Sequence, residues 1–210
     1  MIRSKSRKGW IGASDTAMVM GNWNTDTFRK WWLVKLGLAT NEFKSRQMAA
    51  GTAYEHKILH AVGITKTDRQ IRCRRLRLRV NLDGETREEI SEVKTHGKPV
   101  FKISKAYWQQ SQVEMFAARK KLRIVAYRMT EAEYANFFLP IDLDRVTLHT
   151  IEFDVAWIED AYLPRLIYLA YCFRKGKMPD ACEIEGYVNR VGKPKADRFF
   201  RDRWRLFRRV

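Results

Sequence analysis

Near residue 71 the hydrophobic pattern changes from a helical period to a period of two, which constrains the fold more than any other feature of the chain. Before the change, helices are predicted at 17–20, 25–36 and 43–62, each followed by a glycine. After it, the stretch 71–82 alternates apolar residues with arginines, the pattern of a half-buried strand. An Asp-Gly pair at 83–84 then predicts a turn. The chain therefore combines helices with a sheet.

The remaining elements extend this pattern. They are strands at 89–95, 123–129 and 146–153, and helices at 104–120 and 156–173. The predicted fold class is mixed α/β, with a small mixed sheet flanked by helices. We expect a single domain over 1–191 that carries a basic N-terminal arm at 1–9, followed by a basic and aromatic C-terminal extension at 192–210.

Positive charge dominates the composition. Lysine and arginine number 41 against 24 acidic residues, so the formal net charge is +17 and the isoelectric point is about 10.0. Such an excess favours nucleic acid as the partner, with an anionic membrane surface or a generic basic surface as alternatives. No apolar run approaches the ~18 residues that a membrane span needs, so no membrane partner is expected.

Cysteine and histidine usage argues against other kinds of site. Cys73, Cys172 and Cys182 are odd in number and widely spaced, which supports neither a disulfide framework nor a four-cysteine metal site. A reducing cytoplasm fits this pattern. His56 and His60 share a helix face, but no H-E-x-x-H motif accompanies them, so zinc is not supported.

The most informative segment is Asp83-Gly84 followed by Glu92-Val93-Lys94. Alternate residues of a strand share a face, so Glu92 and Lys94 project together. Two carboxylates can hold Mg²⁺, and an adjacent ammonium can orient an attacking water, which are the needs of phosphodiester hydrolysis. An exposed cross-strand ion pair would give the same Glu-x-Lys pattern, so this segment alone does not decide between the two.

Four segments in order decide it, because together they resemble the phage lambda exonuclease-like (YqaJ-type viral recombinase) branch of the PD-(D/E)XK nucleases. They are R-K-G-W-I-G-A-S-D at 7–15, M-A-A-G-T-A-Y-E at 48–55, D-G at 83–84 with E-V-K at 92–94, and Q-S-Q-V-E-M at 110–115. The match spans about residues 7–130. The family has an apolar residue and then proline after its lysine, whereas Thr95 and His96 stand here. The resemblance implies a restriction-endonuclease-like core.

The resemblance also implies a metal centre. Asp83 and Glu92 would ligate the ion together with the backbone carbonyl of Val93, and Glu55 would act on this ion, or on a second one, through water. The expected cofactor is Mg²⁺, with Mn²⁺ as the alternative.

Further roles follow from the same resemblance. Lys94 would serve the nucleophilic water and Gln112 would help to position it. Arg7 and Ser14 would bind a 5′-terminal phosphate, and a guanidinium with a hydroxyl at a helix N-terminus makes an anion site on physical grounds too. The catalytic set implied is Glu55, Asp83, Glu92, Lys94 and Gln112.

The basic surfaces predict sequence-independent contacts with DNA phosphates. Arg75, Arg77 and Arg79 are expected on one face of the strand at 71–82. The C-terminal extension interleaves arginines with four aromatic residues, Phe199, Phe200, Trp204 and Phe207. We expect these rings to pack on the body of the protein rather than to stack on bases.

The resemblance implies a 5′→3′ exonuclease acting on double-strand DNA ends. It would release mononucleotides and leave 3′ single-stranded tails for a strand-annealing protein in phage recombination. A ring-shaped homotrimer, a phage or prophage origin and the bacterial host cytoplasm belong to the same expectation. A structure-specific or restriction-like endonuclease and a catalytically silent DNA-binding module are the alternatives. An end-phosphate site separates exonuclease from endonuclease, and the intact Asp83, Glu92 and Lys94 set argues against the silent module.

Overall fold

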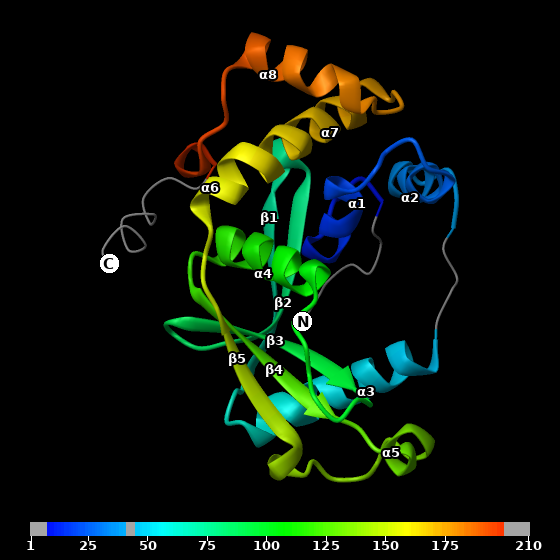
Figure 1. Cartoon of the computed structure of the whole chain (residues 1–210), viewed down its shortest axis with the longest axis vertical. Helices are drawn as coiled ribbons and strands as arrows, with labels where there is room; N and C mark the ends of the chain where they lie inside the picture. Colours follow the sequence, from blue (N-terminus) through cyan, green and yellow to red (C-terminus); the bar gives the residue numbers. More distant parts are fainter. Residues whose placement is uncertain (1–7, 41–44, 200–210) are drawn as a thin grey trace.

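The computed structural model describes residues 8–40 and 45–199, and it is built around one five-stranded sheet in the order β1-β2-β3-β4-β5 (Figure 1). The strands are β1 (Lys66–Cys73), β2 (Leu78–Glu85), β3 (Glu89–His96), β4 (Lys121–Arg128) and β5 (Val146–Ile151). Strands β3 and β4 are parallel, and the other neighbours are antiparallel. This mixed sheet with flanking helices confirms the predicted fold class.

The helices begin at capping residues visible in the sequence. They are α1 (Thr16–Met20), α2 (Asp26–Leu36), α3 (Arg46–Ala61), α4 (Lys105–Ala118), α5 (Glu131–Ala135), α6 (Val155–Trp157), α7 (Leu163–Lys175) and α8 (Ile184–Val191), with a π-helical segment at Ile158–Tyr162. The side chains of Thr25, Ser45 and Ser104 each accept one backbone N–H in the first turn of α2, α3 and α4, so these residues fix where the helices start. Short 3₁₀ turns lie at Ala13–Asp15, Arg74–Leu76, Leu143–Arg145, Ala181–Glu183 and Ala196–Arg198.

Helices cover both faces of the sheet because the strands alternate apolar residues on both sides. On one face, Ile124 of β4 belongs to the same buried cluster as Phe116 of α4. On the other face, Val125 belongs to a second cluster with Tyr54 of α3. Burial of side chains of this size contributes about 1.5–3 kcal/mol each. Helix α4 is also the crossover between the parallel strands β3 and β4, which fixes its position on one face of the sheet (Figure 1).

The predicted single strand at 71–82 is wrong: the segment is a hairpin. Strand β1 ends at Cys73, a 3₁₀ turn follows at Arg74–Leu76, and Arg77 takes a left-handed conformation with φ 52°. The alternation continues through the turn, so the periodicity does not reveal it. Consequently Arg75 and Arg77 lie at the tight end of the hairpin, whereas Arg79 lies within β2 and is only 7% exposed. The three arginines do not form the single exposed strand face that was expected.

The predicted turn at Asp83-Gly84 is also wrong, because β2 runs on to Glu85. The glycine serves close packing instead. A Cβ at Gly84 would lie 2.7 Å from Cδ2 of Leu59 on α3. The absence of a side chain lets α3 approach the strand directly beside Asp83.

At the C-terminal end of the described chain, Phe199 packs against the larger buried cluster, and the guanidinium of Arg75 lies 5.5 Å from its ring centre. This agrees with the expectation that the aromatic residues of the extension pack on the body. Phe200, Trp204 and Phe207 lie outside the described residues. Within 8–40 and 45–199, no helix has the length and apolar character needed to cross a membrane.

Candidate active site

The sheet opens between β2 and β3, and Asp83 stands at the opening. The two strands pair at Gly84 with Ser91 and at Glu85 with Ile90, next to the turn that joins them. The pairing of β2 with β3 does not extend to Asp83; there the carboxylate oxygen Oδ2 accepts the N–H of Val93 at 2.9 Å. A carboxylate therefore replaces a ladder bond, which places it beside the middle of β3.

Glu92 and Lys94 project from β3 toward α4, while Val93 between them belongs to the cluster under α3. The alternation predicted from the sequence is therefore present. The ammonium Nζ of Lys94 donates to Oε1 of Glu92 at 2.5 Å and lies 4.9 Å from the ring centre of Tyr107. Glu92 is only 5% exposed, so this is a buried charge pair rather than the exposed pair considered as the alternative.

Helix α4 supplies two further polar groups. The amide Nε2 of Gln110 donates to Oε1 of Glu92 at 2.6 Å and to Oε1 of Glu114 at 2.8 Å. Its Oε1 accepts from Lys94 at 3.3 Å. One glutamine thus joins three charged side chains from a strand and a helix, and Glu114 is itself 2% exposed.

The structure corrects the role expected for Gln112. This residue is fully buried, and its Nε2 donates to the carbonyl of Glu152 at 2.7 Å while its Oε1 accepts the N–H of Asp154 at 2.7 Å. Both ends of the amide are used to hold the chain between β5 and α6. Gln110, two positions earlier, contacts the charged cluster instead. The reason is helical geometry, because residues two positions apart point to nearly opposite sides of a helix.

Glu55 approaches the cluster from α3. Neither Glu55 nor Lys94 lines the pocket formed by Asp83, Glu92, Gln110 and Glu114, but the charge of Glu55 interacts with Glu92 and Lys94. Glu55 also belongs to a second group: its carboxylate, His56 and Asp68 of β1 have ligand atoms that all lie within 4.8 Å of one another. The His56 Nε2 to Asp68 Oδ2 distance is 3.2 Å. Glu55 therefore stands between two sets of ligand-type side chains.

The cluster holds more negative charge than its own cations neutralise. Burial raises the pKa of Asp83 well above its usual range, and the charges of Glu92 and Glu55 raise it further. Burial and Glu92 likewise raise the pKa of Glu114. Burial disfavours the Lys94 ammonium, yet the adjacent Glu92 outweighs this and raises the pKa of Lys94 above its ordinary value. Hard carboxylate oxygens that repel one another in this way fit a divalent cation.

The same pocket, about 170 Å³ in volume, extends from the carboxylates to the loop before α1. Its lining includes Asp83, Glu92, Gln110 and Glu114 at one end and Gly12, Ala13, Ser14, Lys35 and Arg79 at the other. Ser14 is exposed to this space. The structure therefore brings Asp83 and Glu92, two of the predicted hydrolytic residues, and the predicted anion-binding Ser14 into one hollow.

A buried carboxylate holds the loop in place. Asp15 accepts the N–H of Gly12 at 2.6 Å and the indole N–H of Trp31 at 2.9 Å, and it is paired with the ammonium of Lys35. Lys35 is 2% exposed yet lines the pocket. Arg7, the other residue expected to bind a terminal phosphate, lies outside the described residues.

Sequence reasoning missed Gln110, Glu114 and Lys35 as site residues. For the first two a signal was present, because Tyr107, Gln110 and Glu114 follow helical spacing and so share one face of the helix. Lys35 gave no such signal, since a lysine near the C-terminal end of a helix is normally an exposed residue that interacts with the helix dipole.

The chain has the fold of known exonucleases. LHK-Exo, an alkaline exonuclease from Laribacter hongkongensis, was solved with dAMP; its TM-score is 0.59 at 19% identity, covering 88% of this chain and 94% of that chain. A phage-related exonuclease from Haemophilus somnus 129PT gives 0.57 at 16% identity, covering 87% and 96%. No known family profile and no curated protein matches the sequence. These likenesses confirm the expected fold, which the chain shares with these exonucleases.

Proposed function

We propose that this chain, which has the fold of the lambda exonuclease-like nucleases, is a divalent-metal-dependent 5′→3′ exonuclease of double-stranded DNA. The single observation that carries the proposal is the shared pocket. It places Asp83 and Glu92 in the same hollow as Ser14, so one substrate can reach a hydrolytic group and an end-recognition loop together. The net charge of +17 supports a nucleic-acid substrate.

The metal site in this proposal consists of Asp83 and Glu92, the Val93 carbonyl, and Glu55 acting through water. When bound, Mg²⁺ or Mn²⁺ supplies a charge sink for the phosphate oxygens and lowers the pKa of a water. Glu114 lines the same end of the pocket and is joined to Glu92 through Gln110, so it adds a further carboxyl group beside the proposed cation. Gln110 holds Glu92 in place through its 2.6 Å hydrogen bond.

Lys94 acts on the nucleophilic water in this proposal. Its ammonium is fixed by Glu92 and Gln110, so its position does not depend on substrate. With a divalent cation held by Glu92, the Lys94 ammonium would lie beside a like charge, so Lys94 would release its proton more readily. The lysine then stands beside the water that attacks phosphorus.

Recognition of the DNA end belongs to Ser14 and Arg7. In the described chain, the pocket beside Ser14 is lined by Arg79 and by the ion pair of Lys35 with Asp15, and guanidinium and ammonium groups there suit a phosphate. A terminal phosphate held here would set the scissile bond over the carboxylates and allow only the end nucleotide to be removed. LHK-Exo was solved with dAMP, a deoxynucleoside monophosphate of the kind expected as product.

The biological setting follows from the resemblance. We place the enzyme in phage-type recombination, where a single-strand annealing protein uses the 3′ tails that it leaves. A homotrimer around the DNA, a phage or prophage origin and action in the bacterial cytoplasm belong to the same proposal. The Haemophilus somnus neighbour is described as a phage-related exonuclease, which supports it.

The test compares three DNA substrates in Mg²⁺: a linear duplex with 5′-phosphate ends, the same duplex with 5′-hydroxyl ends, and a covalently closed circle. We expect rapid loss of the 5′-phosphorylated duplex, slower loss of the hydroxyl form and no cutting of the circle. Lys94→Ala is the inactive control. Cutting of the circle would instead support an endonuclease, and binding without any cutting would support a silent DNA-binding module.

A further inference from the structure

A second hollow adjoins the candidate active site on its cationic side. It measures about 440 Å³ and is lined by Trp10, Arg74, Arg75, Arg77 and Arg174. Trp10 also lines the pocket that contains Asp83 and Ser14. The two hollows therefore share one aromatic residue. We call the second one the arginine cleft.

Strand β2 leads from one hollow to the other. Asp83, Asn81 and Arg79 occupy alternate positions, point to one face and all line the catalytic pocket. Arg77, in the turn just before β2, lines the arginine cleft. Alternate strand residues are about 6.7 Å apart, which is comparable to the spacing of successive phosphates along an extended nucleic-acid strand. From Asp83 through Asn81 to Arg79 the side chains thus change from acidic to cationic, at a spacing comparable to that of successive DNA phosphates.

The segment before α1 runs alongside this part of β2 and fixes Trp10 between the hollows. The N–H of Ile11 donates to the carbonyl of Arg77 at 2.8 Å, and the N–H of Arg79 donates to the carbonyl of Ile11 at 2.8 Å. Trp10 is half-buried, and the guanidinium of Arg72 lies 5.7 Å from its ring centre. The backbone bonds therefore hold an aromatic ring at the passage from the catalytic pocket to the arginine cleft.

The charge of the arginine cleft is not balanced locally. Among the described residues, those lining it are one tryptophan and four arginines, with no acidic side chain. Like charges gathered in this way destabilise a fold, and a bound polyanion relieves the repulsion. Guanidinium groups contact phosphates, and aromatic rings stack on unpaired bases. A cleft with both kinds of group suits single-stranded nucleic acid better than a duplex, whose bases are already stacked.

We propose that the arginine cleft binds a single-stranded 5′ extension of the DNA substrate. The inference rests on the proposed function, which puts the 5′ end of the cut strand at Ser14. On a blunt duplex the terminal phosphate stops at Ser14 and the arginine cleft stays outside the complex. On a duplex with a 5′ overhang, the strand continues past Trp10, one base stacks on that ring, and the following phosphates contact the arginines.

The test measures binding by fluorescence anisotropy in Ca²⁺, which we use to limit hydrolysis. Three duplexes of the same sequence are compared: a blunt duplex, one with a 5′ extension and one with a 3′ extension. Each extension is roughly ten nucleotides long, a length typical of single-strand binding grooves. We expect the full chain to bind the 5′-extended duplex about tenfold more tightly than the blunt one, the equivalent of one stacked base. The 3′ extension should add much less.

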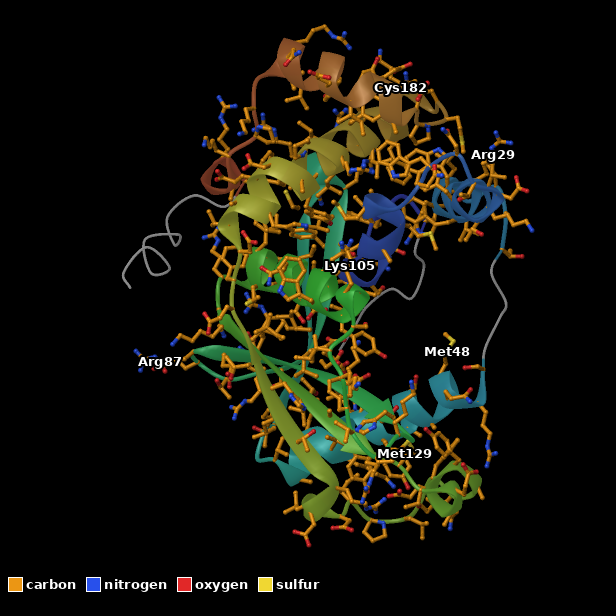
Figure 2. All side chains as sticks on the ribbon, viewed as in Figure 1. Arg29, Met48, Arg87, Lys105, Met129 and Cys182 are labelled. Atoms are coloured by element: carbon orange, nitrogen blue, oxygen red, sulfur yellow. The ribbon has the colours of Figure 1, made fainter. Side chains whose placement is uncertain are left out.

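The variants locate this gain. In the double variant Arg74→Ala/Arg174→Ala, the ratio of the affinity for the 5′-extended duplex to that for the blunt duplex should fall toward one. Trp10→Ala should lower this ratio by a similar factor. The charge-matched control is Arg87→Ala/Arg128→Ala, which removes two exposed arginines that do not line the arginine cleft; Arg87 lies at the turn between β2 and β3 (Figure 2). The control should keep the ratio. Circular dichroism melting of each variant confirms that it is folded.

Two results would overturn the inference. One is a 3′ extension that adds as much affinity as a 5′ extension; the other is an equal loss of the ratio in the control variant, which would make the effect one of net charge. Hydrolysis of the blunt 5′-phosphorylated duplex in Mg²⁺ is assayed in parallel. If that duplex is degraded but the 5′ extension adds no affinity, the assignment of the arginine cleft is wrong while the proposed function stands. If it is not degraded, the proposed function fails.

Discussion

Two single variants, Gln110→Ala and Gln112→Ala, test whether Gln110 serves the active site and Gln112 serves the fold. Gln112 makes two hydrogen bonds of 2.7 Å to backbone groups of residues 152 and 154 and is fully buried. Its removal leaves a carbonyl and an N–H without these partners, which we expect to cost about 2–4 kcal/mol of folding stability. For a domain of this size, that lowers the melting temperature by roughly 4–16 °C.

Gln110 should show the opposite pattern. It is half-buried, and its hydrogen bonds of 2.6 Å and 2.8 Å go to Glu92 and Glu114, two carboxylates that repel each other. Gln110→Ala should cost less stability than Gln112→Ala, because the two carboxylates that it releases line the pocket and can reach water. It should lower the rate of hydrolysis by about 10- to 100-fold, the usual effect of losing a group that orients a metal ligand.

The assay combines differential scanning calorimetry with digestion of a 5′-phosphorylated duplex, at a temperature where both variants are folded. The expected result is a crossed one: Gln112→Ala is less stable and close to normal in rate, and Gln110→Ala is stable and slow. If instead Gln112→Ala were stable and inactive while Gln110→Ala was active, the assignment made from side-chain contacts would be refuted.

Three further predictions follow from the same contacts. Mg²⁺ at about 100 times its dissociation constant should stabilise the protein by about 2.7 kcal/mol, or roughly 5–11 °C in melting temperature, and Asp83→Asn should abolish the shift; equal shifts in both proteins would argue against the site. Lys94→Ala should lower the rate of hydrolysis by about 10²- to 10⁴-fold in a Mg²⁺-dependent digest, and a near-normal rate would remove its proposed role. Although burial disfavours the Glu133 carboxylate, hydrogen bonds from Arg145 and Tyr127 lower its pKa to about 2, below its unfolded value of 4.5. Its stabilising contribution is therefore present above about pH 4.5 and is lost as the pH falls toward 2. Between these pH values the melting temperature of Glu133→Gln should change less with pH than that of wild type.

Local signals in the sequence predicted most of the elements. Helices predicted to begin at Thr25 and Ser104 are capped by these residues in the structure, and the predicted end at Gly37 holds, because each depends on local backbone chemistry. The placement of Glu92 and Lys94 on one face follows from strand alternation alone, and the structure shows it. These features were predictable because each is decided within a few residues.

The errors arose where distant parts of the chain decide the outcome. The hairpin turn at Arg74–Leu76 keeps the alternating pattern, so only the pairing of β1 with β2 reveals it. Gly84 is required by the approach of Leu59 from α3, a contact that local sequence cannot show. The Q-S-Q-V-E-M motif contains both Gln110 and Gln112 and does not show which of them contacts Glu92. That contact depends on how α4 lies over the opening between β2 and β3.

Locating a bound cation directly is the sharpest test of the claim that these carboxylates gather around one ion. Crystals grown with Mn²⁺ allow its anomalous scattering to identify the ion without ambiguity. Our account places a peak about 2–2.5 Å from carboxylate oxygens of both Asp83 and Glu92. A peak confined to Glu55, His56 and Asp68, or the lack of any peak beside Glu92, would contradict it.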